Sequence, residues 1–596
     1  MLSPSSRVIA VALFCLLVPG FALADLVPIQ INGYFEDWAG LAHVLDDSND
    51  DAGPVDFGRV WVANDQDYLY IRFETEGEVQ PDEQQNMRLY LDTDMNAGTG
   101  TAFGGIGAEL MWEFGQRDGI FKPGSSYTVE HADVGLMMGP TVSNNQFEVA
   151  IRRDAIPAGG QALFTGDNIR FILRDTNSGD VAPNSGSVAY TFTAGSIDTP
   201  SLALTRDDPT HIRIATWNVE GDGLFDGGSA EQAQNRMLDA MDPDVLVINE
   251  VWNHNATEVR AKIEQHLPSG AGEDWYAVMR DAGNVIVSRY PILQSWEVNP
   301  GYRVTAALLD LGEASDKDLL LIANHWRCCT ADQDRQNEAD SVIGFLRDAK
   351  TAGGVVTVPE GTPFVLCGDL NLVGWRQQLD TVITGDIQDE GTYGADAAPD
   401  WDGSDFTYPL SRHPDARASY TWRKDYSTYY PGVLDYIMYT DSVLDIHNHF
   451  VLETRTMTPA TLAANGLQTY DTTDASDHAP RVADFTVFNP LSSVPQVPAT
   501  GGARLLPNIP NPFNPSTELR FELDSPGAVE LSVYDARGHL VRDLVSGQYG
   551  AGPFSARWDG ADRAGRRVAS GVYQVRMVAR VDAATVVRTR SITLVE

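Results

Sequence analysis

Residues 318–326 read DLLLIANHW and residues 363–373 read PFVLCGDLNLV, and each segment is an apolar run that ends in or gives way to polar residues. Apolar runs of this length predict β-strands that are buried on both faces. Between them, residues 337–350 read NEADSVIGFLRDAK, in which apolar residues recur with a helical period. A strand, a helix and a second strand in this order predict an α/β domain. The polar residues at the strand ends lie where ligands collect in such folds.

The same pattern extends over residues 212–488. Further buried strands are predicted for IRIATWNV (212–219), DVLVINEV (244–251), NVIVSRYPI (284–292) and VLDYIMYT (433–440), and further helices for AEQAQNRMLDAM (230–241) and TEVRAKIEQHL (257–267). Polar residues lie at or near the strand ends: Asn218, Glu250, His325, Asp369, Asn371 and Asp435. Asp477 and His478 follow in ASDHAP, which by itself is either a surface turn or half of an active site. Because unpaired buried carboxylates are costly, their number in these strands favours the active site.

The segments ATWNVEG, DVLVINEVW, ANHW, CGDLN, LDYIMY and SDHAP resemble, in order and rough spacing, the motifs of the endonuclease/exonuclease/phosphatase superfamily. That superfamily includes deoxyribonuclease I, apurinic endonucleases, bacterial neutral sphingomyelinases and inositol polyphosphate phosphatases. The resemblance covers residues 210–488, nearly half of the chain. It implies a four-layer α/β sandwich of the deoxyribonuclease I type, in which two β-sheets pack face to face with helices outside.

The resemblance also implies a metal-dependent hydrolysis of phosphate esters. A hard divalent cation stabilises the charge that develops on the phosphate, and Mg²⁺ is expected, with Mn²⁺ or Ca²⁺ as alternatives. Glu250 matches the family's metal-binding glutamate. Asn218 and Asp477 match positions that complete or border the ion site.

Four further residues match positions that act on the substrate. His478 matches the histidine that takes a proton from attacking water or shares it with the phosphate, and Asp435 matches the carboxylate that orients this histidine. His325 matches a second histidine, which is a phosphate ligand or a general acid. Asp369 and Asn371 match the pair that aligns the nucleophile and contacts the phosphate. Whether His478 or Asp369 is the general base stays open.

Substrate contacts are predicted outside these motifs. Arg327 follows His325 closely and is either a phosphate contact or an ordinary surface arginine. Residues 408–430 combine basic and aromatic side chains, a mixture that binds single-stranded nucleic acid by charge and stacking; they are Arg412, Arg417, Tyr420, Trp422, Arg423, Lys424 and Tyr426. Among these, Arg423, Lys424 and Trp422 are the predicted substrate residues, and an ordinary aromatic-rich loop is the alternative.

Residues 25–205 alternate short apolar runs with turn clusters, which predicts an all-β sandwich. INGYFEDWAG and LYLDTDMNAGTG resemble the N-terminal sandwich related to carbohydrate-binding module family 9 and DOMON-like domains, which implies polysaccharide as a partner. Asp92, Asp94 and Asn96 alternate, so their oxygens could converge on a structural Ca²⁺, with a plain turn as the alternative. An aperiodic stretch, residues 196–210, reads as a linker to the middle domain.

Residues 489–503 form a second, Pro/Gly/Ser-rich linker, and residues 504–596 are again β-rich. PNPFNPST and the segments that follow it resemble the C-terminal sorting domains of type IX secretion substrates, which have an Ig-like fold. The resemblance implies contact with a secretion machinery, export across an outer membrane, and release or surface attachment. An ordinary Ig-like spacer is the alternative. Because neither linker carries a core pattern, residues 210–488 are expected to fold and act alone.

The N-terminus predicts where the protein works. Residues 1–24 have Arg7, a short apolar run and a small-residue cleavage site, which together predict a secretory signal peptide rather than a membrane span. No later stretch is apolar enough to span a bilayer, so the mature chain is expected outside the cell of a bacterium, secreted or attached to its surface. Three cysteines remain beyond the signal, Cys328, Cys329 and Cys367, and disulfides are not expected to stabilise the fold.

The sequence as a whole therefore predicts a secreted, multidomain phosphodiesterase, a nuclease, in which two all-β domains flank the α/β domain. The net charge of −41 repels nucleic acid at long range, so a polyanionic substrate would need cations or a local basic patch. A phosphomonoesterase or a sphingomyelinase-like lipase is the alternative within enzymes. A non-catalytic surface adhesin that keeps the fold is the alternative of another class.

Overall fold

In the computed structural model the chain forms two compact units, one that ends at Leu491 and one that begins at Ser492. The structure describes residues 26–594 except 48–54, 81–85, 271, 355, 489–502, 507, 509–512, 514–515, 524, 535–539, 562, 564–565, 569–570 and 582–583. The predicted signal peptide, and the predicted linker 489–503 except for its last residue, lie outside the described residues. Within the described part of the chain, no helix combines the length and the apolar character that a membrane span needs.

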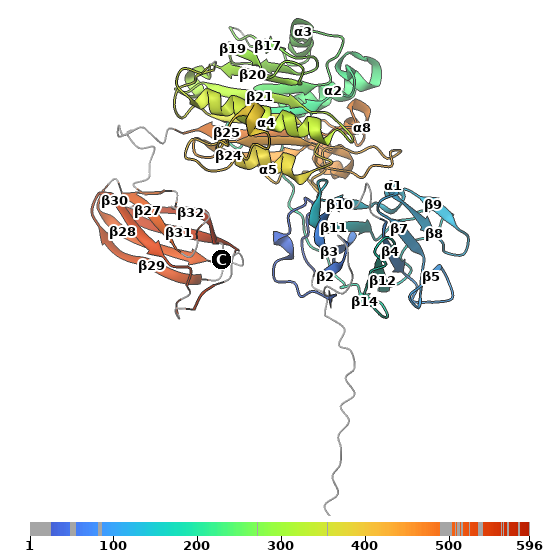
Figure 1. The fold of residues 1–596 in the computed structure, drawn as a ribbon. Coiled ribbons are helices and arrows are strands. Elements are labelled where there is room, and N and C mark those ends of the chain that lie inside the picture. The colour runs from blue at the N-terminus through green and yellow to red at the C-terminus, as the bar shows by residue number, and fades with distance from the viewer. Residues whose placement is uncertain are drawn as a thin grey trace, which may run out of the picture. The chain divides into compact units, whose positions relative to one another are not determined.

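The first unit begins with two antiparallel sheets that share one core (Figure 1). One sheet has the order β1 (Leu45–Asp46), β2 (Phe57–Asn64), β3 (Tyr68–Val79), β11 (Asn144–Arg152), β10 (Met137–Gly139). The other has the order β13 (Val181–Ala182), β12 (Asn168–Asp175), β4 (Met87–Asp92), β7 (Leu110–Glu113), β8 (Asp118–Phe121), β9 (Tyr127–Val129), and β14 (Val188–Thr191) pairs with β12. A separate hairpin, β5 (Thr101–Phe103) with β6 (Ile106–Ala108), and the short helix α1 (His131–Val134) complete this sandwich.

The middle region also contains two sheets. The first has the order β17 (Tyr276–Val278), β18 (Val285–Ser288), β16 (Val245–Asn249), β15 (Ile212–Asn218), β25 (Arg481–Val487), β24 (Leu444–Val451). The second has the order β19 (Ile292–Glu297), β20 (Val304–Leu309), β21 (Leu319–His325), β22 (Phe364–Asp369), β23 (Asp435–Tyr439). The pairs β15–β16 and β21–β22 are parallel, and their neighbours are antiparallel. The sequence predicted six of these strands, and the six are present.

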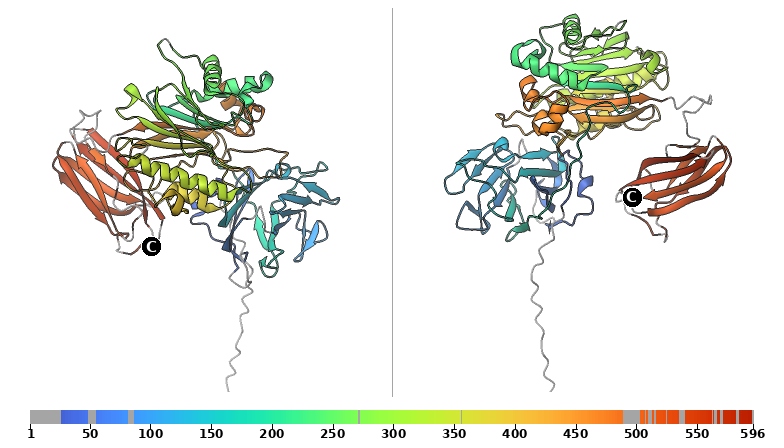
Figure 2. Two further views of the ribbon diagram at one scale, coloured as in Figure 1. Left: turned by 45° about the horizontal axis from the view of Figure 1, so that its top comes forward. Right: turned by 180° about the vertical axis from the view of Figure 1, so that it is seen from behind.

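Alternation along the strands builds the four layers. In β15, Ile214 points to the other sheet, whereas Ala215 and Trp217 pack under the outer helices α2 (Gly228–Met241) and α3 (Ala256–His266). In β22, Val365 faces the other sheet, whereas Leu366 packs under α4 (Asp332–Lys350) and α5 (Arg376–Thr384). The order is thus helices, sheet, sheet, helices (Figures 1 and 2), as the family resemblance implied. Three short helices lie in the connections, α6 (Glu390–Tyr393), α7 (Pro459–Ala464) and α8 (Asp471–Ala475).

The N-terminal sandwich packs directly against the middle domain. One buried cluster joins Ile31, Trp38 and Tyr70 of the sandwich to Ala418 and Tyr420 of the middle domain. The stretch predicted as a linker, residues 196–210, forms no helix or strand, but it lies along the middle domain. Within it Leu204 is buried in the core under α2, and the guanidinium of Arg412 donates to the Pro200 carbonyl.

The second unit has a three-stranded and a four-stranded sheet around one core. The orders are β26 (Ala503–Leu505), β27 (Thr517–Leu523), β30 (Gly552–Trp558), and β29 (Leu540–Tyr549), β28 (Gly527–Tyr534), β31 (Gly571–Val581), β32 (Ala584–Leu594). Strict alternation in β28, where Val529, Leu531 and Val533 are buried, explains why the sequence identified this part as β-rich. Most of the PNPFNPST segment lies outside the described residues.

Candidate active site

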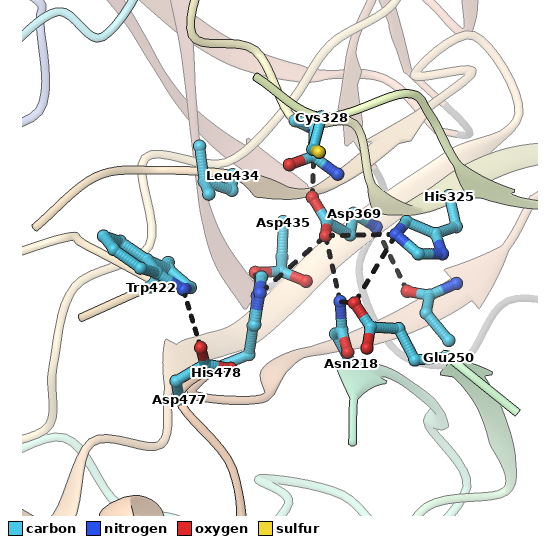
Figure 3. Close-up of polar contacts among 12 residues, drawn as sticks. Asn218, Glu250, His325, Cys328, Asp369, Trp422, Leu434, Asp435, Asp477 and His478 are labelled. Carbon is cyan, nitrogen blue, oxygen red and sulfur yellow. Dashed lines mark hydrogen bonds and ion pairs between the residues drawn. The ribbon is translucent and has the colours of Figure 1, made fainter. Parts of the chain in front are cut away.

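Five polar side chains meet at one edge of the two stacked sheets (Figure 3). Asn218 ends β15, Glu250 follows β16, His325 ends β21, Asp369 ends β22, and Asp435 begins β23. Parallel pairing sets His325 beside Asp369, and antiparallel pairing sets Asp369 beside Asp435. The topology therefore gathers residues that are up to 217 positions apart in sequence, between Asn218 and Asp435.

Asn218 is the fully buried centre of this group. Its Nδ2 donates to Glu250 Oε1 at 3.1 Å and to Asp369 Oδ2 at 3.0 Å. Its Oδ1 accepts from the Glu220 backbone N–H at 3.1 Å. A single amide thus connects a carboxylate of one sheet with a carboxylate of the other.

Glu250 has a left-handed backbone conformation, with a φ of 66°. Such a conformation is unfavourable for a residue with a Cβ and is kept where the surroundings enforce it, often at functional sites. Its Oε2 is anchored by the Gly221 N–H at 2.8 Å. Its Oε1 lies 3.7 Å from His325 Nε2, and a quarter of the side chain stays exposed. Both oxygens of this partly exposed carboxylate therefore have a partner, the Gly221 N–H at Oε2 and the Asn218 amide at Oε1.

His325 is buried and lies against an arginine that the sequence did not identify. The guanidinium of Arg303 is 3.2 Å from His325 Nδ1, so this nitrogen accepts and Nε2 carries the proton. Burial and the charges of Arg303, His478 and Arg327 hold the pKa of His325 well below its usual value. His325 is therefore neutral at pH 7, and its Nε2–H lies 3.8 Å from Asp369 Oδ2.

His478 lies on the other side of Asp369 and has the opposite environment. Its Nδ1 is 2.8 Å from Asp435 Oδ2, and its Nε2 is 3.8 Å from Asp369 Oδ2. Burial opposes charge on this ring, but the Asp435 and Asp369 carboxylates outweigh burial and raise the pKa of His478 to about 10. The ASDHAP segment is held against β15, because the Ser476 hydroxyl donates to the Asn218 carbonyl.

Asp369 and Asn371 form a rigid corner after β22. Asp369 Oδ1 accepts from the Asn371 N–H at 2.9 Å, and the Asp369 N–H donates to Asn249 Oδ1 at 3.1 Å. Burial raises the pKa of Asp369 to about 7, against the attraction of His478. Asn371 has a φ of 48° and donates from Nδ2 to the Trp326 carbonyl at 3.1 Å.

Asp477 points away from Glu250, toward Trp422 (Figure 3). Its Oδ2 accepts from Trp422 Nε1 at 3.1 Å and lies 3.4 Å from Lys424 Nζ. Lys424 also pairs with Glu220 at 2.6 Å. Trp422 forms a β-bridge to His478, so the 422–424 segment borders the site as the sequence predicted. Arg423 points elsewhere, to Asp425 at 2.6 Å and to the Tyr420 hydroxyl at 3.3 Å.

Three other residues of the 408–430 segment do not face a substrate. Arg412 donates to the backbone carbonyls of His413 and Pro414. Arg417 pairs with Asp65 of the N-terminal sandwich, and Tyr420 is buried. The prediction that all the basic residues of this segment contact successive phosphates is therefore wrong for Arg412 and Arg417, because their guanidinium groups serve the packing of the domain.

Two site residues were missed by sequence reasoning. They are Arg303 and Trp252. The exposed ring of Trp252 lies 5.5 Å from the His325 ring, and the Arg303 guanidinium lies over the Trp252 ring, 5.3 Å from its centroid. Neither residue ends a buried strand, so the pattern that identified the others could not find them. Trp252 follows Glu250 by two positions, and that closeness was the available signal. Arg327, which was predicted, has an exposed side chain, and its charge contributes to the low pKa of His325.

The donors at this edge fit a hard divalent cation. The partly exposed carboxylate of Glu250 and the carboxylate of Asp369 both accept from Asn218 Nδ2, and carboxylate oxygens are ligands that Mg²⁺ prefers. The Gly221 N–H and the left-handed backbone of Glu250 keep its carboxylate in place. A second acidic group, Asp92, Asp94 and Glu109, lies in the N-terminal sandwich.

The cysteines take no part in a long-range bridge. Cys367 is buried within β22 as a free thiol, so it is not paired with either of the other two. Cys328 and Cys329 are exposed neighbours whose Sγ atoms lie 2.6 Å apart.

Comparison with known protein families gives one match in the middle domain and one in the last domain. Residues 215–478 match the family described as Endonuclease/Exonuclease/phosphatase family, and residues 509–582 match the FlgD Ig-like domain. No curated protein matches the chain. The chain thus contains an endonuclease/exonuclease/phosphatase domain followed by an Ig-like domain.

Among solved structures, several align with just under half of this chain. TDP2 of D. rerio, complexed with single strand DNA product, is 17% identical, with 47% of this chain and 100% of that chain covered and a TM-score of 0.30. ANGEL2, described as a 2′,3′-cyclic phosphatase, is 16% identical over 46% and 96% of the two chains, with a TM-score of 0.32. A family protein from Leptotrichia buccalis C-1013-b is 11% identical over 46% and 99%, with a TM-score of 0.30.

Proposed function

We propose that the middle domain is a divalent-metal-dependent phosphodiesterase that hydrolyses nucleic acid by attack of water on phosphorus. One observation carries the proposal: Asp369 Oδ2 lies 3.8 Å from both His325 Nε2 and His478 Nε2 and 3.0 Å from an amide that also contacts Glu250. Acid–base groups and an oxygen donor for a cation thus meet at one point, which hydrolysis of a phosphate ester requires.

Glu250 and Asn218 would hold the cation, with Asp477 at the border of the site. The bound ion would stabilise the charge that develops on the phosphate oxygens in the transition state. Mg²⁺ is the ion expected, and Mn²⁺ or Ca²⁺ are the alternatives. Gly221 holds one oxygen of Glu250, so the other oxygen keeps its place whether or not substrate is bound.

His478 is charged at pH 7, so in its pair with Asp369 the carboxylate accepts the proton of the attacking water. Asp435 accepts from Nδ1–H of His478, which directs Nε2 toward Asp369 and the reacting groups. The water oxygen forms the new bond to phosphorus while the bond to the leaving oxygen breaks. Neutral His325 donates from Nε2–H to a phosphate oxygen or to the leaving oxygen, because Arg303 keeps its Nδ1 an acceptor.

A polymeric substrate is favoured over a phosphomonoester or a choline phospholipid by the rim of the site. The exposed Trp252 ring beside His325 can stack on a base, and Lys424 and Arg327 supply positive charge on a strongly acidic chain. Sphingomyelinase-like and phosphomonoesterase activities remain the alternatives, and a non-catalytic adhesin is the alternative outside enzymes.

The direct test measures hydrolysis of DNA, RNA, a chromogenic phosphodiester, a phosphomonoester and sphingomyelin, each with Mg²⁺ and with EDTA. We expect cleavage of DNA or RNA that EDTA abolishes and Mg²⁺ restores. Glu250→Gln should lose most activity at limiting Mg²⁺ while it keeps its circular dichroism spectrum, and Glu231→Gln, remote on α2, should behave as wild type. Metal-independent cleavage, or full activity of Glu250→Gln, would refute the metal assignment.

A second test separates polymer from small substrates. Trp252→Ala should raise KM for nucleic acid about tenfold, since one stacked base contributes about 1–3 kcal/mol. Lys424→Gln should also raise this KM, because a positive charge beside the site is lost, and both variants should leave the chromogenic diester nearly unchanged. Lys262→Gln, whose amine pairs with Glu231, is the matched control. Equal effects on both substrates would favour the phosphatase or lipase alternative.

We also propose that the protein is exported to the outside of the bacterial outer membrane through its C-terminal domain, and that the N-terminal sandwich binds polysaccharide. The match of residues 509–582 to an Ig-like domain supports a separate module, and the resemblance of PNPFNPST to sorting domains supports export. Fusing residues 504–596 and the signal peptide to a reporter tests this proposal. A reporter that stays in the periplasm of a type IX-competent host would refute it.

A further inference from the structure

A group of three carboxylates lies at one end of the N-terminal sandwich, in the sheet that contains β4. Asp92 ends β4, Asp94 lies in the turn that follows, and Glu109 stands between β6 and β7. Each side chain contributes an oxygen to a group in which all the separations are within 4.8 Å. The sequence suggested Asp92 and Asp94 together with Asn96, whereas Glu109 becomes a neighbour through the pairing of β4 with β7, which sets Leu91 opposite Leu110.

Two of the carboxylates are buried with one oxygen unsatisfied. Asp92 is 0% exposed and Glu109 is 5% exposed. Asp92 Oδ2 accepts from Arg170 at 2.6 Å, and Glu109 Oε2 accepts from the Thr93 N–H at 2.9 Å. Asp92 Oδ1 and Glu109 Oε1 have no hydrogen-bond partner among the described residues. A buried carboxylate oxygen without a partner destabilises the fold, so we expect a ligand to contact these two oxygens.

The turn around Asp94 is already shaped for a ligand. Asp94 Oδ1 accepts from the Asn96 N–H at 2.8 Å, and the Thr99 hydroxyl lies 2.9 Å from Asp94 Oδ2. Asn96 Oδ1 accepts from the Gly98 N–H at 3.0 Å, so it is used within the turn. These bonds hold the Asp94 carboxylate next to the two buried ones although all three carry negative charge when ionised.

Charge makes a cation the fitting occupant. Around three carboxylates the described residues supply one close cation, Arg170, which pairs with Asp92. Two oxygens that share a Ca²⁺ at about 2.3–2.6 Å lie at most about 5 Å apart, which the observed separations satisfy. Ca²⁺ tolerates an irregular set of protein oxygens better than Mg²⁺, which demands a near-ideal octahedron and keeps more of its water.

We propose that Asp92, Asp94 and Glu109 bind one structural Ca²⁺, which fastens the turn after β4 to the connection between β6 and β7. The site is separate from Glu250 and does not depend on the proposed hydrolysis. Its role is to neutralise the carboxylates that the pairing of β4 with β7 brings together at this end of the sandwich, where Leu91 lies opposite Leu110.

The experiment uses the full chain in a Glu250→Gln background, so that the proposed catalytic cation does not contribute. Calcium binding is measured by isothermal titration calorimetry in excess Mg²⁺, and protection of residues 92–110 by hydrogen exchange with CaCl₂ or EDTA. We expect one Ca²⁺ per chain and a Ca²⁺-dependent gain of protection confined to these residues. Adding Glu109→Gln, which preserves the acceptor for Thr93, should abolish both. Asp118→Asn, an acid on β8 outside the group, should abolish neither.

The stability of Glu109→Gln in EDTA and in CaCl₂ distinguishes a glutamate that binds an ion from one that only stabilises the fold. If Glu109 serves the ion, Glu109→Gln should be at least as stable as its parent in EDTA, because one repelling charge is gone, and less stable only in CaCl₂. An equal loss of stability in both conditions would overturn the proposal. So would a chain that binds no Ca²⁺ or whose Ca²⁺ binding survives Glu109→Gln.

Discussion

His325 and His478 lie at the same distance, 3.8 Å, from the same oxygen of Asp369, yet their partners drive their pKa values apart. Arg303 and burial keep His325 neutral, whereas Asp435 and Asp369 raise the pKa of His478 to about 10. Two titratable groups with opposed environments can divide the acid and base roles between them. At the scale of single residues, the partner of Nδ1 therefore determines how Nε2 is directed at Asp369. This partner is Arg303 for His325 and Asp435 for His478.

Asp435→Asn tests this division. An amide supports the charged His478 ring poorly and no longer fixes its tautomer, so kcat should fall by about 10²–10⁴-fold while KM changes little. The pKa of His478 should also drop toward its ordinary value, which an NMR titration of the imidazole would detect. Asp445→Asn, an exposed acid of β24, is the control. An unchanged His478 titration in Asp435→Asn would contradict the assignment.

Sequence reasoning found those site residues that interrupt buried strands and missed those in connections. Asn218, His325 and Asp369 were visible because a polar residue at the end of an apolar run is unusual. Arg303 lies before β20 in a polar stretch, where an arginine is unremarkable, and only the sheet pairing brings it to His325. Glu109 was missed for the same reason, since only the pairing of β4 with β7 brings it next to Asp92.

At the scale of elements, the 408–430 segment shows how composition can mislead. Its basic and aromatic residues suggested one substrate surface, but Arg412, Arg417 and Tyr420 pack inward and only the stretch from Trp422 to Lys424 borders the site. The segment has no helix or strand of its own, so no periodicity revealed which side chains point inward. In contrast, helices α2, α3 and α4 follow the predicted periods closely, because each presents one apolar face to a sheet.

His413 makes this segment sensitive to acid. It is fully buried, its Nε2 donates to the Tyr420 carbonyl at 2.9 Å, and burial lowers its pKa to about 4. The unfolded chain takes up a proton below about pH 6.5, but the folded chain does so only below about pH 4. The contribution of His413 to the free energy of unfolding is therefore complete above about pH 6.5. As the pH falls from there toward 4, the free energy of unfolding decreases by up to about 3 kcal/mol.

The variant His413→Gln tests this dependence of the free energy of unfolding on pH. The variant should be less stable than wild type at pH 7.5, and the difference should narrow progressively down to pH 4, because the glutamine takes up no proton. Urea unfolding at a series of pH values measures both curves. His254→Gln, with a partly exposed ring, is the comparison. Parallel curves for wild type and His413→Gln would show that another group controls acid stability.

At the scale of the whole first unit, the N-terminal sandwich holds the loop that borders the active site. The loop is closed at its base by β-bridges from Trp422 to Gly432 and to His478. Its far end reaches the sandwich, where Tyr430 is buried in the sandwich core and the Ser427 carbonyl lies 3.1 Å from His131 Nε2. The expectation that residues 210–488 act alone rested on linkers without a core pattern, and it did not consider a loop that contributes to a neighbouring core.

We therefore expect the fragment 210–488 to lose solubility, or to keep activity on a chromogenic diester while it loses activity on nucleic acid. Removing the sandwich would expose Tyr430, Tyr420 and Ala418, all of which are buried in shared clusters. The loop with Trp422 and Lys424 would then have no support at its far end. A soluble fragment with wild-type activity on both substrates would contradict this expectation.

Tyr430→Phe tests the coupling in the intact chain, where loss of folding is less of a concern. The Tyr430 hydroxyl donates to the Phe114 carbonyl and accepts from Trp112 Nε1, both at 3.0 Å, so its removal leaves buried sandwich groups without these bonds. We expect the free energy of unfolding to fall by about 1–3 kcal/mol. If the sandwich positions the loop, KM for nucleic acid should rise while the chromogenic diester is hydrolysed normally. Tyr429→Phe, whose ring is 40% exposed, is the control. A loss of stability with unchanged KM would mean that the sandwich stabilises the loop without positioning it, because the bridges at Trp422 would then be sufficient to place the residues that border the site.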